Sequence, residues 1–231
     1  MNIASTIANS SSNFYNVLKN DKHGRYLSWE HCYYEFHKAR GKELTEKDYD
    51  YLALHLSFYL ASWGMYRGSS FLLWQDYKVH IPAVKEIMNC RYDSLLGIKC
   101  IEYSKKENQN KLETLNNFLK KYYNEIRLSI KDNKPSNEIS DTLITKILLG
   151  SLGCVPAYDT YFKYGIKKHK IASAKYNLKS ILSLCDFYNG NRLEFDEVCS
   201  TMKIKEIPYP QMKFLDMGFW EIGFVNDKTS N

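Results

Sequence analysis

The chain has 231 residues, of which 44% are hydrophobic, and carries 32 Lys and Arg against 26 Asp and Glu, for a formal net charge of +6. This content is enough to bury a core and excludes a disordered segment. Eleven Gly and five Pro are few for this length and disfavour a turn-rich β-sandwich or barrel. The expected fold class is therefore all-α, as a single domain over residues 1–231.

The first half of the chain predicts helices separated by short turns. In chain order they are a short one around Phe14 in a loosely packed segment 1–27, then 28–40, 45–63, 71–77, 81–89, 93–96 and 103–131. Thr45 is a good capping residue, and the apolar spacing behind it runs to Trp63. The helix at 103–131 has a single apolar stripe, which is typical of a surface helix.

The second half follows a polar stretch, Lys-Asp-Asn-Lys-Pro-Ser-Asn at 131–137, which predicts a loop or linker. This linker divides the chain into two expected lobes, 1–133 and 134–231, with a cleft between them. The predicted helices behind it are 141–150, one opening after Asp159, 173–188, 193–202 and 210–224. The last is hydrophobic nearly all round, so we expect it to be buried.

Residues 141–160 read Asp-Thr-Leu-Ile-Thr-Lys-Ile-Leu-Leu-Gly-Ser-Leu-Gly-Cys-Val-Pro-Ala-Tyr-Asp-Thr and predict a helix, a glycine turn and a second helix. Gly150 and Gly153 are expected to supply the positive φ of the turn. Pro156 prevents the first helix from continuing. Asp159 can then cap the next helix, which fixes the carboxylate of Asp159 at the N-terminus of that helix.

This helix, glycine turn and Pro-x-x-Asp-Thr sequence, over residues 140–162, resembles the end of the helix-hairpin-helix motif of DNA glycosylases. The resemblance implies an all-α fold of two lobes with a cleft. It also implies an enzyme that flips a nucleobase and cleaves its N-glycosidic bond, leaving an abasic site in DNA. Asp159 would be the catalytic aspartate, whose carboxylate stabilises positive charge on the sugar or orients an attacking water, and Lys146 would be the nucleophile found in some members. An unusual base is an expected substrate, including the modified bases of phage DNA in antiphage defence.

Each of these residues also has an ordinary structural interpretation. Asp159 can be a helix cap alone, Lys146 a solvated lysine, and the turn at 63–70 a plain connection between helices. A flipped base needs stacking faces and polar groups that read its edge. The candidates for a base pocket are Trp63, Tyr66, Arg67, Gln75 and Tyr158.

No acid occurs between Thr160 and Ser183, whereas six lysines do. Such a run is commonly a solvated face, but it also suits a phosphate backbone. On the second interpretation the partner is DNA, and its backbone is contacted by Lys163, Lys167, Lys168, Lys170, Lys175 and Lys179. The alternative function is a non-catalytic helical module of a defence or toxin–antitoxin system that binds nucleic acid or protein.

Other site classes lack their motifs. The six cysteines form no Cys-x-x-Cys pair and are expected to be reduced, mostly buried thiols of a cytoplasmic protein. The four-cysteine iron–sulfur loop of some glycosylases is absent, and we expect no cofactor and no metal. No P-loop, zinc deaminase or lipase motif occurs, and no segment predicts a membrane span.

Overall fold

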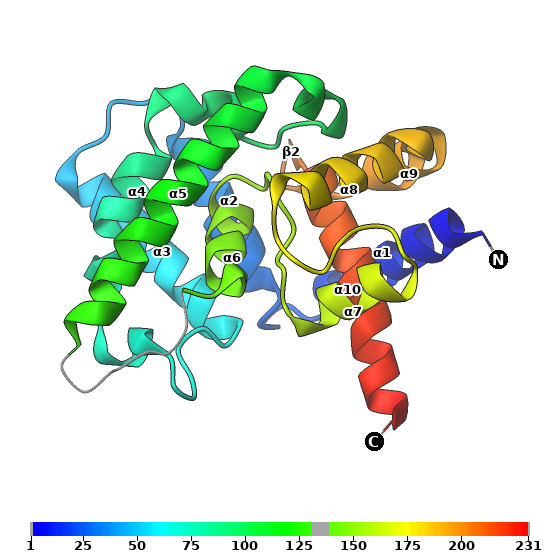
Figure 1. Cartoon of the computed structure of the whole chain (residues 1–231), viewed down its shortest axis with the longest axis horizontal. Coiled ribbons are helices and arrows are strands. Elements are labelled where there is room, and N and C mark those ends of the chain that lie inside the picture. The colour runs from blue at the N-terminus through cyan, green and yellow to red at the C-terminus, as the bar shows by residue number, and fades with distance from the viewer. Residues whose placement is uncertain (1, 131–138, 231) are drawn as a thin grey trace.

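The computed structural model describes residues 2–130 and 139–230 and is mostly helical, which confirms the predicted all-α class (Figure 1). Its α-helices are α1 (Ile3–Asn20), α2 (Leu27–Ala39), α3 (Glu46–Ser62), α4 (Ile81–Ile87), α5 (Lys106–Ser129), α6 (Asp141–Ser151), α7 (Thr160–Lys168), α8 (Leu178–Gly190), α9 (Arg192–Cys199) and α10 (Gln211–Ser230). Short 3-10 helices are η1 (Phe71–Trp74), η2 (Tyr77–His80), η3 (Cys90–Leu95) and η4 (Cys100–Ser104). Strands β1 (Lys203–Ile204) and β2 (Ile207–Pro208) pair antiparallel.

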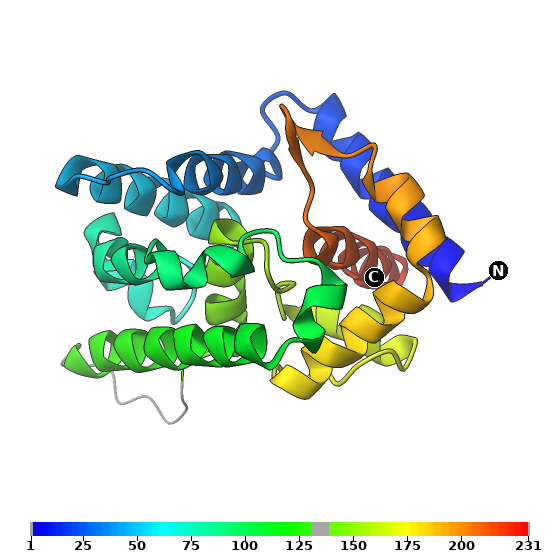
Figure 2. The ribbon, with the colours of Figure 1, turned by 90° about the horizontal axis from the view of Figure 1, so that it is seen from above.

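The helices gather in two sets, seen side by side in Figure 1 and from above in Figure 2. In one set, α3 packs against α2, α4 and α6, and α5 packs against α4 and α6. In the other, α10 packs against α1 and α7, while α9 packs against α1 and α8. The first helix of the chain therefore packs with the last. The linker predicted at 131–137 and the lobe boundary at 133/134 lie outside the described residues.

Helix α1 is longer and better packed than the short, loose helix predicted within residues 1–27. Ser11, near its middle, is fully buried, and its hydroxyl donates a 2.9 Å hydrogen bond to the carbonyl of Phe214 on α10. A Cβ at Gly218 would lie 2.6 Å from Ser11 Oγ, so the missing side chain allows α10 to approach α1. Besides these small residues, Ile7, Phe14 and Leu18 are buried on the same face of α1.

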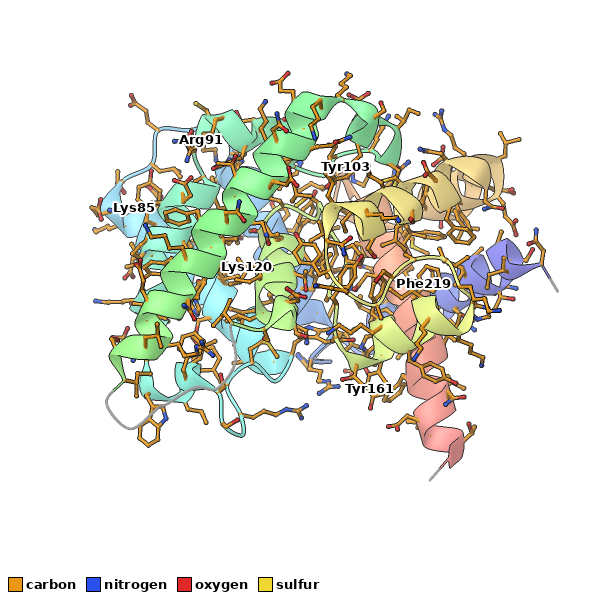
Figure 3. The ribbon with its side chains drawn as sticks, in the orientation of Figure 1. Lys85, Arg91, Tyr103, Lys120, Tyr161 and Phe219 are labelled. Carbon is orange, nitrogen blue, oxygen red and sulfur yellow. The ribbon has the colours of Figure 1, made fainter. Side chains whose placement is uncertain are left out.

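Helices α7 and α10 touch through their backbones. A Cβ on Gly165 of α7 would collide with the carbonyl of Phe219, and a Cβ on Gly223 of α10 would collide with the carbonyl of Tyr161. Figure 3 labels Tyr161 and Phe219 on these two neighbouring helices. The two glycines therefore permit a closer approach than any other residue would.

Some predicted boundaries shift because side chains cap different residues. The helix predicted over 71–77 is instead two separate 3-10 turns, η1 and η2, which are capped by Ser70 and Asp76. The helix predicted over 173–188 begins only after Asn177, whose side chain caps α8. The antiparallel pair β1–β2 was not predicted, because two residues per strand leave no alternating pattern.

The cysteines are all free, and only Cys90 is exposed, in agreement with the prediction of mostly buried thiols. Across residues 2–130 and 139–230, no helix has the length and apolar character needed to cross a bilayer. The same residues contain no group of three or more His, Cys, Asp or Glu side chains that could hold a metal ion.

Candidate functional site

The glycine-containing turn after α3 forms one edge of the site. Gly64 and Gly68 have φ angles of +77° and +61°, in the region that favours glycine. Helix α3 ends at Ser62 and Trp63 is its C-cap, so the carbonyl of Trp63 is available to a partner outside the helix. It accepts a 3.0 Å hydrogen bond from Nζ of Lys146 on α6. The turn is thereby joined to the middle of a helix in the second half of the chain.

The two glycines at the end of α6 have different roles from one another. Gly153 has φ of +62° and ends the helix, as predicted. Gly150, predicted to turn in the same way, lies inside α6 instead. A Cβ there would lie 2.5 Å from the ring of Tyr59, so Gly150 admits that ring from α3. The prediction of positive φ at Gly150 was therefore wrong, because close packing explains this glycine.

The residues that lead into α7 are held against α6 by two threonines. The N–H of Tyr158 donates to Oγ1 of Thr145, and the hydroxyl of Thr142 donates to the carbonyl of Tyr158, both at 2.9 Å. Both threonines lie within about one turn of Lys146 on α6. The next residue, Asp159, is consequently delivered beside the lysine.

Asp159 uses its two carboxylate oxygens for different purposes. Oδ1 accepts the N–H of Phe162 at 3.1 Å, which makes Asp159 the N-cap of α7 as the sequence predicts. Oδ2 lies 3.6 Å from Nζ of Lys146. The cap and a chemical role were weighed as alternatives, but this geometry allows both at once.

The Lys146–Asp159 pair is almost removed from solvent, with side-chain exposures of 5% and 15%. Burial lowers the pKa of Lys146, against the opposing attraction of Asp159 and Asp216. Burial likewise raises the pKa of Asp159, against the opposing attraction of Lys146. The interpretation of Lys146 as a solvated lysine is therefore wrong. Burial thus opposes the charged form of each group, so the proton of the Lys146 ammonium is easier to remove than that of an exposed lysine.

A pocket of about 450 Å³ lies over this pair. Its lining consists of Arg25, Ala61, Ser62, Trp63, Gly64, Met65, Arg67, Thr142, Lys146, Asp159, Thr160, Tyr161, Trp220 and Phe224. The pocket thus draws residues from both sets of helices.

Aromatic rings form one wall of the pocket. The ring of Trp220 meets Trp63 edge to face at 5.8 Å between centroids and meets Tyr161 at 5.3 Å. The guanidinium of Arg25 lies 5.8 Å from the Trp63 ring centre. Among the described residues, Arg25 and Arg67 have no ion-pair partner. The pocket therefore combines stacking faces, two unpaired cations and the lysine–carboxylate pair.

Three residues predicted for a base pocket lie elsewhere. The hydroxyl of Tyr66 is 2.8 Å from Nε2 of His80, on the inner side of the turn. Tyr158 is fully buried, and its hydroxyl lies 2.7 Å from Oγ of Ser180. Gln75 ends η1 and does not line the pocket. Of the five candidates, the structure brings Trp63 and Arg67 to the lysine–carboxylate pair.

The six predicted backbone-binding lysines follow Asp159 along α7 and into α8. Lys163 is half-buried and the others, Lys167, Lys168, Lys170, Lys175 and Lys179, are exposed. None has an ion-pair partner in the part of the chain that the structure describes, and none lines the pocket. These six lysines, here called the basic surface, carry positive charge without an internal counter-charge, as binding to an anionic partner would require.

Sequence reasoning missed several residues of the site. Arg25 lies in the segment assigned to a loose edge, and Trp220 was placed simply in the core. Lys213 and Asp216 form a buried ion pair of 2.8 Å on α10 behind the pocket. Two opposite charges three residues apart in the apolar stretch from Met212 to Trp220 were a signal that could have identified this pair.

Comparisons with protein families, with curated proteins and with solved structures gave no match to the chain. What the pocket does must therefore be inferred from its own residues.

Proposed function

We propose that the chain is a DNA glycosylase-like enzyme that excises a nucleobase and leaves an abasic site. The two sets of helices would be its two lobes and the pocket its active-site cleft. The observation that carries this proposal is the contact between Lys146 and Asp159 at the base of a pocket with aromatic walls. The same two residues are those that the resemblance to helix-hairpin-helix glycosylases implies.

The pair has the chemistry that base excision requires. The amine of Lys146 would attack C1′ of the sugar while the bond from C1′ to the base nitrogen breaks and the base leaves with the electron pair. The positive charge that develops on the sugar would be stabilised by the carboxylate of Asp159. The departing base takes up one proton of the attached amine. The ring C1′–O bond then breaks, the ring oxygen takes up the second proton, and the C–N bond becomes a Schiff base. Burial supports this route because it lowers the pKa of Lys146, which eases loss of the proton that the ammonium must give up before it can attack.

The pocket walls suit an extruded nucleotide. Trp63, Tyr161 and Trp220 offer ring faces and edges for a base, and stacking is a main source of affinity for unpaired bases. Arg25 and Arg67 would bind the flanking phosphates, with which guanidinium groups pair well. The basic surface from Lys163 to Lys179 would hold the adjoining backbone.

The test uses DNA duplexes with normal bases, damaged bases or 5-hydroxymethylcytosine. Alkali-labile abasic sites report excision, and trapping by borohydride reports a Schiff base. We expect wild-type protein to produce both signals on at least one substrate and Lys146→Met to lose the trapped adduct. Lys85→Met is a matched control, because Lys85 is exposed and paired with Glu46. No product on any duplex would count against the enzyme.

The second candidate is a helical module that binds nucleic acid without catalysis. The unpaired lysines after Asp159 favour it, because they suit an anionic partner and involve no chemistry. Such a module would bind DNA equally well with Lys146 and Asp159 replaced, and no duplex would be cut after alkali.

A further inference from the structure

A second buried ion pair lies behind the Lys146–Asp159 pair. Nζ of Lys213 is 2.8 Å from Oδ2 of Asp216, and their side chains are only 2% and 6% exposed. Two buried charges are retained at a cost in desolvation, so the pair calls for an explanation beyond stability. The contacts of Lys213 and Asp216 suggest one. Asp216 binds the segment that precedes Asp159, and Lys213 lies beside Trp63, which also contacts Lys146.

Asp216 holds the segment that carries Asp159. Its Oδ1 accepts the N–H of Ala157 at 2.9 Å, while Oδ2 faces Lys213. The carbonyl of Ala157 in turn accepts the N–H of Asp159 at 2.8 Å. Two consecutive hydrogen bonds therefore connect the carboxylate of Asp216 on α10 to the backbone of Asp159.

Lys213 shares an aromatic neighbour with Lys146. The two ammonium groups lie 5.7 Å and 5.4 Å from the ring centre of Trp63. Lys213 also lies 4.9 Å from the ring centre of Trp29. Both lysines therefore lie beside the ring of Trp63, and each also has a carboxylate partner, Asp159 for Lys146 and Asp216 for Lys213.

The charged and titratable groups that face Lys146 come from three elements. Asp159 precedes α7, Asp216 and Lys213 lie on α10, and Tyr59 of α3 is fully buried near both carboxylates. Asp159 raises the pKa of Lys146 most among the charges, Asp216 raises it next, and Lys213 lowers it. Asp216 also raises the pKa of Asp159 by repulsion. The charges of Lys213 and Asp216 therefore act on Lys146, and the charge of Asp216 acts on Asp159 as well.

We propose that Asp216, paired with Lys213, is a positioning residue that holds Asp159 opposite Lys146 and acts on the Lys146 ammonium through its charge. The kinetic consequences of this inference rest on the proposed function. The effect of Asp216 on Lys146 can be measured without any substrate.

The experiment compares Asp216→Asn, Asp216→Ala and Lys213→Met. Asn keeps an oxygen for the N–H of Ala157 but loses the charge, whereas Ala loses both. The titration of Lys146 is followed by NMR on protein labelled with ¹³C at lysine Cε, and its signal is assigned by its loss in Lys146→Met. Asp196→Asn is the control, because Asp196 is a carboxylate paired with Arg192 on α9.

We expect the titration midpoint of Lys146 to shift in opposite directions in Asp216→Asn and in Lys213→Met. Asp216→Asn should lower it, because an attracting charge is removed, and Lys213→Met should raise it, because a repelling charge is removed. The pH–rate profile of base excision should shift in the same two directions. Asp216→Ala should in addition lower the rate on the order of 10²-fold, the cost of misplacing a reacting group by about 1 Å.

A purely structural pair would change stability and leave the midpoint of Lys146 in place, and that result would overturn the proposal. If a single variant does not fold, the double variant Lys213→Met and Asp216→Asn removes both charges, and the titration midpoint of Lys146 is measured in it instead. A midpoint below that of wild type supports the coupling, and an equal or higher one overturns it. Opposite shifts in a protein that excises no base would uphold the coupling and reject the proposed function.

Discussion

Nζ of Lys146 donates a 3.0 Å hydrogen bond to the carbonyl of Trp63, a residue 83 positions earlier in the chain. The bond fixes the direction of the amine and joins the turn after α3 to α6. It also leaves Oδ2 of Asp159 as the nearest carboxylate oxygen to the amine, at 3.6 Å. Lysine, carboxylate and turn therefore form one unit.

Asp159→Asn should keep the cap of α7, lose the charge that faces the buried Lys146 and remove activity. As an N-cap Asn is about as good as Asp, so the capping contribution to stability should change by less than about 1 kcal/mol. Loss of the carboxylate that faces the sugar should lower the excision rate on the order of 10²-fold or more. Thermal melting and single-turnover kinetics measure the two effects. Full activity in the folded variant would falsify the catalytic assignment of Asp159.

Trp63→Ala should reduce excision more than duplex binding, because stacking acts only after the base is extruded. Tyr66→Phe is the matched control on the same turn. It removes the hydroxyl bonded to His80, and Tyr66 itself does not line the pocket, so we expect a loss of about 1 kcal/mol in stability with the excision rate unchanged. Kinetics, binding and melting curves on both variants check this. Equal losses of binding and excision in Trp63→Ala would contradict a base-stacking role.

DNA affinity should fall steeply with salt, because lysines at the phosphates release counterions. Replacing Lys167 and Lys168 by Ala should reduce the slope of log K against log salt by about 1.8. The control replaces Lys85 and Lys105, which pair with glutamates. Figure 3 labels Lys85 on α4, far from α7 in that view. Fluorescence anisotropy at several salt concentrations measures the slopes. Equal slopes in the two double variants would show that Lys167 and Lys168 do not contact the DNA backbone.

Acid should destabilise the fold through His80. This histidine is fully buried between the hydroxyls of Tyr66 and Tyr123, and burial lowers its pKa from 6.5 to about 3. Between these values the unfolded chain binds a proton that the folded chain does not, so stability is lost as pH falls through this window. The slope should be at most about 1.4 kcal/mol per pH unit.

Urea unfolding at several pH values tests this dependence. His80→Gln keeps a polar side chain but cannot titrate, so its stability should vary less with pH between 6 and roughly 3. The exposed His23, replaced in the same way, is the control. A wild-type slope that persists in His80→Gln would assign the acid sensitivity to other groups.

Local patterns predicted what depends on neighbouring residues. The span of α3, the helix at 141–150 and the cap by Asp159 follow from apolar spacing, a glycine and a capping side chain within a few positions. The burial of Lys146 does not, because it depends on Trp63 and on helix α10. An exposed and a buried lysine look alike in a local pattern, and only long-range packing separates them.

The pocket walls show the same limit. Trp220 and Tyr161 meet because two glycines let α10 and α7 touch, and no short window contains both helices. Tyr66 and Tyr158 were assigned to the pocket from their proximity in sequence to Trp63 and Asp159. Their hydroxyls instead satisfy buried partners, His80 and Ser180.

The backbone contact between α7 and α10 determines which parts of the site can move. Gly165 and Gly223 leave no layer of side chains between these helices, so there is nothing there to slide or repack. Helices α7 and α10 should therefore move together as one rigid unit that carries Asp159, Tyr161 and Trp220. If the pocket opens to admit a ligand, we expect the movement in the turn after α3, where Gly64 and Gly68 have positive φ angles, rather than between α7 and α10.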